Sequence, residues 1–82
     1  MKAESFIIDF PDAQVAKIYS DRWVNTATLM GIMYQHVAVP FGEGKYHYRA
    51  AFDGHEDDVK RFMYFINESI SLLDKSEIVH EN

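Results

Sequence analysis

The sequence predicts a small α+β fold in which an antiparallel sheet packs one face against two helices. Three observations give this prediction. Apolar residues from His55 to Leu73 recur at three- and four-residue steps, which is the period of one helical face. Residues 34–52 hold two strand-like runs around the turn sequence Gly42-Glu43-Gly44-Lys45. Residues 5–23 read as a further strand followed by a helix.

The first strand is expected at Ser5–Phe10, because Phe6, Ile8 and Phe10 occupy alternate positions and Pro11 ends the run. A first helix is expected from Asp12 to about Trp23, after the proline. One side of this helix is expected to carry Val15, Ile18, Tyr19 and either Arg22 or Trp23.

Residues 24–33 have an ambiguous pattern. The β-branched residues Thr26, Thr28 and Ile32 favour a strand. The remaining apolar residues, such as Ala27 and Leu29, would suit a helix equally well. We expect a strand that begins near Thr26.

The hydrophobic pattern selects the hairpin register, because one residue of slippage turns every side chain to the other face. A four-residue loop places Val39 opposite Tyr48 and Val37 opposite Ala50, which makes one face almost wholly apolar. A three-residue loop would place Val39 opposite His47 and would mix core and charge. We therefore expect the four-residue loop.

The long helix carries its apolar stripe on Val59, Phe62, Met63, Ile66, Ile70 and Leu73. Its first turn is acidic, as the helix dipole favours. Phe65 and Leu72 widen the apolar face. Residues 77–80 are expected to form either a short edge strand or a frayed end. The chain is expected to be a single domain over 1–82, with 76–82 as this edge strand or tail.

The element order is strand, helix, strand, strand, helix, with an optional short final strand, which is the ferredoxin-like arrangement. The chain resembles the small ligand-sensing ACT domains in this order and in size. Phe10-Pro11-Asp12 stands where a glycine-rich ligand turn would separate the first strand from the first helix. The resemblance is therefore one of fold, and shared folds carry many functions.

Composition limits the classes of function. The formal net charge is −5, and residues 53–82 hold eight of the 13 acidic residues but only three of the eight basic ones. No basic stripe is present, so direct nucleic-acid binding is not expected. The chain has no cysteine and no apolar run of membrane-spanning length, and its first residues lack a signal-peptide pattern. We expect a cytoplasmic protein.

Candidate chemical sites have simpler structural explanations. His36 and His47 are expected to share the open sheet face, but a zinc site needs further ligands. The acidic run at residues 55–58 lacks the spacing of a calcium loop. No serine lies in a nucleophile elbow, and the Gly42-Glu43-Gly44-Lys45 turn lacks the spacing of a phosphate loop. We expect no catalytic, cofactor or metal site.

An interaction surface is the remaining candidate. Tyr34, His36, His47 and Arg49 are expected to lie on the open sheet face, where tyrosine and arginine commonly anchor interfaces. Met30 and Ile32 would continue this face as apolar surface if the strand extends upstream. An acidic helix end would complete the protein-binding set with Glu56, Asp57 and Asp58.

The sequence thus predicts a non-enzymatic module that binds another protein, regulates or inhibits it, and also forms a homodimer. Small acidic chains of this kind suit inhibitors of nucleic-acid-handling enzymes, including those that bacteriophages encode. Two alternatives remain open. One is an ACT-like regulatory domain that senses a small molecule at a dimer interface, and the other is a small enzyme of unknown class.

Overall fold

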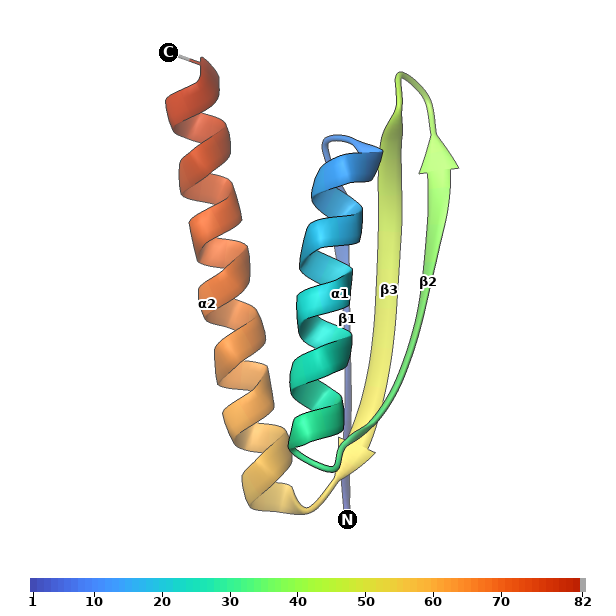
Figure 1. Cartoon of the computed structure of the whole chain (residues 1–82), viewed down its shortest axis with the longest axis vertical. Coiled ribbons are helices and arrows are strands. Elements are labelled where there is room, and N and C mark those ends of the chain that lie inside the picture. Colours follow the sequence, from blue (N-terminus) through green and yellow to red (C-terminus); the bar gives the residue numbers. More distant parts are fainter. Residues whose placement is uncertain (82) are drawn as a thin grey trace.

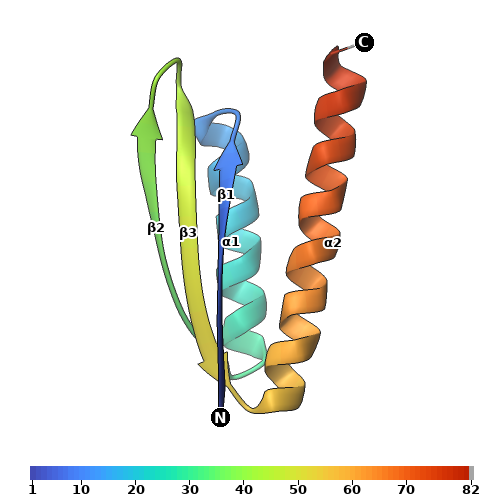
Figure 2. The same ribbon diagram turned by 180° about the vertical axis from the view of Figure 1, so that it is seen from behind.

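A three-stranded antiparallel sheet carries both helices on one face (Figure 1). The computed structural model describes the backbone of residues 1–81 and the side chains of residues 1–73. The elements are β1 (Lys2–Phe10), α1 (Ala13–Leu29), β2 (Met33–Phe41), β3 (Lys45–Gly54) and α2 (Glu56–Glu81). The strand order is β1-β3-β2, with β3 antiparallel to both neighbours. Seen from behind in Figure 2, the sheet lies in front of α1 and α2 stands on the β1 side. The predicted α+β, ferredoxin-like architecture is confirmed.

Helix α1 is longer than the sequence pattern indicated. Its N-terminus is capped by Asp12, whose side chain accepts a hydrogen bond of 2.9 Å from the backbone N–H of Val15. The helix continues to Leu29, so the prediction of a strand beginning near Thr26 is wrong. Ala27 is fully buried within this extra helical segment, and its packing outweighs the β preference of the neighbouring threonines.

Gly31 ends α1 in a defined way. Its φ of 72° lies in the left-handed region that favours glycine. Its N–H donates to the Thr28 carbonyl at 3.1 Å, and the N–H of Ile32 donates to the Ala27 carbonyl at 2.9 Å. This pair of bonds is the Schellman motif, which satisfies the last carbonyls of a helix. Strand β2 therefore begins at Met33 and not upstream.

The β2–β3 hairpin has the register that the hydrophobic pattern disfavoured. Phe41 pairs with Lys45 across a three-residue loop, and Val39 lies opposite His47. The prediction of a four-residue loop is therefore wrong. Glu43 and Gly44 have φ values of 59° and 81°, and the Lys45 N–H donates to the Gly42 carbonyl at 3.2 Å. Hairpin turns whose twist matches that of the strands need a positive φ at both central residues, which here are Glu43 and Gly44. The geometry of the turn therefore decides the register.

Helix α2 matches the predicted stripe and then extends further. Val59, Phe62 and Ile66 are fully buried, and Leu73 is buried as well. The helical backbone continues to Glu81, so no strand forms at residues 77–80. The segment 76–82, predicted as an edge strand or a tail, is therefore helical up to residue 81. Residue 82 lies outside the described residues.

The core lies between the sheet and the two helices and is rich in aromatic rings. Trp23 of α1 is fully buried, with ring centroids 5.4 Å from Phe6 and 5.6 Å from Tyr48. Phe62 of α2 packs edge-on against Phe52 of β3 at 4.8 Å. These contacts come from the even-numbered positions of β1 and β3, which the register places on the helix side. The odd-numbered positions consequently face away from both helices.

Candidate protein-binding surface

The sheet face that points away from the helices is called the open face here. It consists of the odd-numbered strand positions, since side chains alternate between the two faces of a strand. Its members are Ala3, Ser5, Ile7, Asp9, Met33, Gln35, Val37, Val39, Phe41, Lys45, His47, Arg49, Ala51 and Asp53. Every one of these residues is exposed or half-buried. The helices leave the open face uncovered (Figure 2).

Four aliphatic or thioether side chains on the open face are unusually exposed. The exposed fractions are 67% for Ile7, 66% for Met33, 53% for Val37 and 52% for Val39. Scattered exposed apolar residues are ordinary, but several on one sheet face form a patch that commonly marks an interaction site. All four lie on the two edge strands, so they border a more polar central strand.

Strand β3 supplies that polar centre. Arg49 is flanked by Ile7 on one side and Val37 on the other, at the same level of the sheet. A guanidinium between two aliphatic side chains can rest its methylene stem on them while its charge stays in water. Arginine in such surroundings is a common anchor of protein interfaces.

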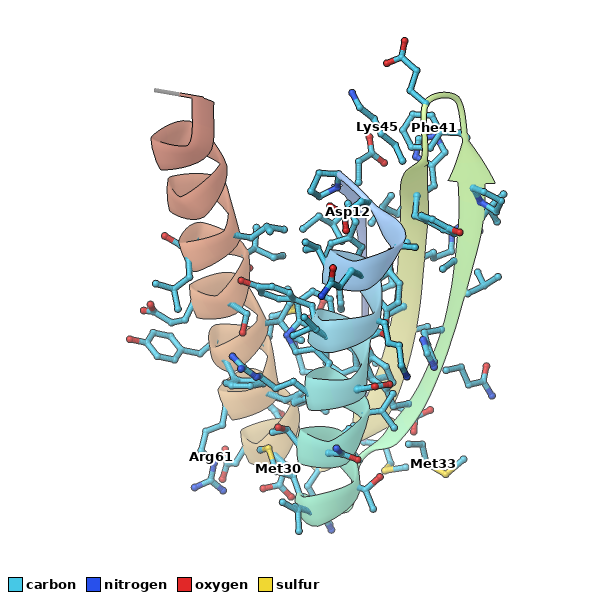
Figure 3. All side chains as sticks on the ribbon, turned by 45° about the horizontal axis from the view of Figure 1, so that its top comes forward. Asp12, Met30, Met33, Phe41, Lys45 and Arg61 are labelled. Carbon is cyan, nitrogen blue, oxygen red and sulfur yellow. The ribbon has the colours of Figure 1, made fainter. Side chains whose placement is uncertain are left out.

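His47 lies one level further along and is held by two neighbours. Its Nδ1 atom pairs with the Asp9 carboxylate of β1. Its ring stacks on Phe41 of β2, with centroids 3.7 Å apart and planes within 5°. These contacts hold the imidazole between β1 and β2. The basic side chains of the open face thus gather toward the hairpin end, where Figure 3 shows Lys45 beside Phe41.

The opposite end of the open face is hollowed at Ala51, because a methyl group stands where its neighbours carry larger side chains. One depression of about 250 Å³ is lined by Gln35, Val37, Arg49 and Ala51, together with His36 from the β2 edge. A second of about 130 Å³ continues past Ala51 toward Asp53. Together they offer a shallow seat for protruding side chains of a partner.

Only two of the four residues predicted on the open face lie there. His47 and Arg49 lie on the open face as expected. Tyr34 and His36 were predicted there, but the observed register turns them to the helix side, so that prediction is wrong. His36 and His47 therefore lie on opposite faces and do not share a site.

Tyr34 is part of the packed side of the sheet. Its hydroxyl is hydrogen-bonded to that of Tyr48 at 2.8 Å, and its ring is 5.6 Å from that of Phe62. Burial raises the pKa of Tyr34 to about 12, although the hydrogen bond from Tyr48 opposes this shift. Burial and the bond to Tyr34 both raise the pKa of Tyr48. Both phenols are therefore neutral structural groups at physiological pH.

Met30 and Ile32 do not extend the open face either. Ile32 is buried with 6% exposure, and Met30 caps the C-terminus of α1. Figure 3 shows Met30 at the end of α1, whereas Met33 projects from the start of β2. Helix α1 occupies the segment in which an upstream strand was expected, so the apolar extension of the face begins only at Met33.

The acidic residues Glu56, Asp57 and Asp58 form the first turn of α2, as predicted from the helix pattern. Glu56 pairs with Lys60 at 3.0 Å, and this contact lowers the pKa of its carboxyl group. Asp58 pairs with Arg61 at 3.0 Å. This turn follows the end of β3, away from the hairpin where Lys45 and His47 lie (Figure 1). The structure therefore does not gather the seven predicted residues into one surface.

A groove on the other side of the sheet is a second candidate site. It has a volume of about 370 Å³ and runs between α1 and the helix-side positions of β2 and β3. Tyr48 forms part of its wall, and Lys17, Ser20, Asp21 and His36 supply polar atoms around it. The Lys17 ammonium is already paired with Asp21 at 3.0 Å.

Sequence reasoning missed the apolar part of the open face. Val37 and Val39 were expected to be protected from solvent, but both are exposed. The signal that would have found them is the turn: a glycine at the end of a three-residue hairpin loop favours the observed register. Met33 was missed because it lay in the ambiguous segment.

None of the family models, curated proteins and solved structures compared with this chain matches it. Across the part of the chain that the structure describes, no helix combines the length and apolarity needed to span a membrane. The described side chains also contain no group of three or more His, Cys, Asp or Glu residues arranged to hold a metal ion.

Proposed function

We propose that this protein is a binding module that docks another protein on the open face and acts by binding and not by catalysis. The observation that supports the proposal is the uncovered patch formed by Ile7, Met33, Val37 and Val39 around Arg49. The opposite face of the sheet is buried against α1 and α2, whereas the described elements leave this one uncovered. Burying exposed apolar surface against a partner is favourable by about 25 cal/mol per Å² before the costs of association.

The net charge directs the proposal toward partners with a basic surface. The formal net charge of −5 favours electrostatic attraction to basic proteins and faster encounter with them. Enzymes that handle nucleic acids carry such surfaces, because they neutralise phosphates with lysine and arginine. In its narrower form, the proposal is that the module regulates or inhibits an enzyme of this class, as phage-encoded inhibitors do.

Affinity capture from a native lysate of the source cells tests the proposal, with matched lysine substitutions. Ile7→Lys and Val37→Lys place a charge on the open face, at side chains that are 67% and 53% exposed. Ile18→Lys is the control, because Ile18 is 50% exposed and lies on α1, away from that face. All three variants should fold, since exposed positions tolerate substitution within about 0.5 kcal/mol.

The open-face variants should lose a captured protein that the wild type and the Ile18→Lys control retain. Arg49→Glu should also weaken binding by about 2 kcal/mol or more, if Arg49 anchors the interface. Capture that is the same for the wild type and both open-face variants would contradict the proposal. For the narrower form, the captured protein should be a nucleic-acid-handling enzyme, and its activity should fall when the module is added.

A small-molecule-sensing role is the second candidate, and the groove beside α1 favours it. Its volume of about 370 Å³ lies in the range of ligand pockets, and His36, Lys17 and Ser20 offer polar contacts. A thermal-shift screen with amino acids and nucleotides tests this role, because a ligand that binds the native state raises its stability. Ala38→Trp at the groove, where an exposed small side chain lines the wall, should abolish any such shift.

A further inference from the structure

We infer that the open face pairs with the open face of a second copy of this chain, through reciprocal contacts between Arg49 and Asp53. This inference rests on the proposed function, because it names an occupant of the same surface. A closed dimer is the commonest protein assembly, and its two-fold axis makes each contact occur twice. The arrangement of charges along β3 fits such an axis.

The charges of the open face are segregated along β3. Lys45, His47 and Arg49 follow one another from the hairpin, and Asp53 lies at the far end. Arg49 and Asp53 are four residues apart on one strand, or roughly 13 Å, so they do not meet within one chain. Among the described side chains, neither of them takes part in an ion pair.

A two-fold axis that runs midway between two facing sheets, parallel to them, perpendicular to the strands and level with Ala51, brings these residues together. It reverses the strand direction of the second copy and brings the two Ala51 residues together. Arg49 of each copy then lies over Asp53 of the other. Because Ala51 is small and the face is hollowed there, two sheets can approach without a clash at the axis.

The same axis matches the apolar residues on both sides. The strand register places Val37 of one copy over Met33 of the other, and Ile7 over Ala3. These contacts cover three of the four most exposed side chains of the open face. The interface then holds two Arg49–Asp53 pairs, with a row of apolar residues from β2 on one side and from β1 on the other. The two-fold symmetry makes this interface self-complementary.

The overall charge of the face also permits self-association. The chain as a whole has a formal net charge of −5, which disfavours contact between two copies. The charged residues of the open face are balanced, since Lys45 and Arg49 offset Asp9 and Asp53. The open face is therefore a surface on which two acidic copies can meet without concentrated repulsion.

The size of the sheet sets the strength of the dimer. With the axis at Ala51, residues 48–54 of β3 and the neighbouring positions of β1 and β2 overlap, which is on the order of 23 Å by 14 Å, or roughly 320 Å² for each copy. A total of about 650 Å² is below the size of stable protein interfaces and fits only a weak, transient complex. The dimer should accordingly have a dissociation constant on the order of 10–500 µM and should not resist dilution.

Sedimentation equilibrium of the purified full chain, from about 10 µM to 1 mM, tests the inference across that range. The wild type should shift from monomer to dimer. Arg49→Asp and Asp53→Arg should each weaken the dimer by at least about tenfold, because each places like charges in contact twice. Emission from the buried Trp23 checks that both variants are folded.

The decisive sample is an equimolar mixture of the two variants. Arg49→Asp offers two carboxylates and Asp53→Arg offers two guanidinium groups, so the mixture restores both opposite-charge contacts in a heterodimer. Matched controls are Arg22→Asp and Asp21→Arg, which make the same charge changes at exposed positions of α1. The controls should dimerise like the wild type, alone and mixed.

Three results would each overturn the inference: a wild type that stays monomeric at 1 mM, single variants that dimerise like the wild type, and a mixture that stays monomeric. The proposed function has a separate readout, since lysate capture detects another protein well below the concentrations at which copies pair. A monomeric wild type that captures a partner through Ile7 and Val37 would reject the dimer and keep the proposed function. A dimer whose open face captures nothing would do the reverse.

Discussion

Phe62 is the side chain whose loss should weaken the fold most clearly. It is fully buried, and its ring meets those of Phe52 at 4.8 Å and Tyr34 at 5.6 Å in edge-on geometry. Phe62→Ala should cost about 3–5 kcal/mol from lost burial and the cavity left behind. Edge-on aromatic pairs contribute about 0.5–1.5 kcal/mol beyond their buried area, so the upper half of that range is expected.

This loss is large for a chain of 82 residues. At about 0.05–0.15 kcal/mol per residue, the whole free energy of unfolding is roughly 4–12 kcal/mol. Phe62→Ala therefore removes a third or more of it and leaves some or all of the protein unfolded. Phe62→Leu, which keeps much of the volume, should remain folded and lose about 1–1.5 kcal/mol.

Urea unfolding monitored by tryptophan emission measures both variants, because Trp23 is the only tryptophan and is fully buried. Tyr64→Ala is the matched control: it removes an aromatic ring from the same helix at a position that is 68% exposed. The control should change stability by no more than about 0.5 kcal/mol. A loss below about 1 kcal/mol for Phe62→Ala, or one equal to that of Tyr64→Ala, would refute the assignment of the buried face of α2.

Two further predictions concern ionisation and the helix end. Stability should hold up to about pH 10 and then fall. The reason is that the pKa of Tyr34 is raised to about 12 in the folded state and that of Tyr48 is also raised, so the unfolded chain loses these protons first. Tyr34→Phe should make the urea midpoint fall less steeply with pH between pH 8 and 12. A fall as steep as that of the wild type would contradict the role of Tyr34. Gly31→Ala should cost about 1 kcal/mol or more, because φ is 72° there, whereas Gly42→Ala should cost clearly less; equal costs in thermal unfolding would contradict the Schellman end of α1.

The helical stripe of α2 could be predicted from the sequence because a single period runs through it without interruption. Val59, Phe62 and Ile66 recur at helical spacing, and each is fully buried in the structure. The alternation of Phe6, Ile8 and Phe10 likewise placed β1 and its inward side. In both elements, the local pattern and the tertiary packing require the same residues on the same face.

The sequence determined the order of the elements, the two-layer α+β architecture and the exposed positions of His47 and Arg49. Only the tertiary structure decided which face of β2 is open. Two registers of the hairpin differ by one residue, and the apolar count favoured the one that buries Val37 and Val39. The positive φ values of Glu43 and Gly44 impose the other register, so Tyr34 enters the core and the two valines reach solvent. A hydrophobic pattern records only how well each residue suits burial, and the geometry of the turn sets which residues the sheet can bury.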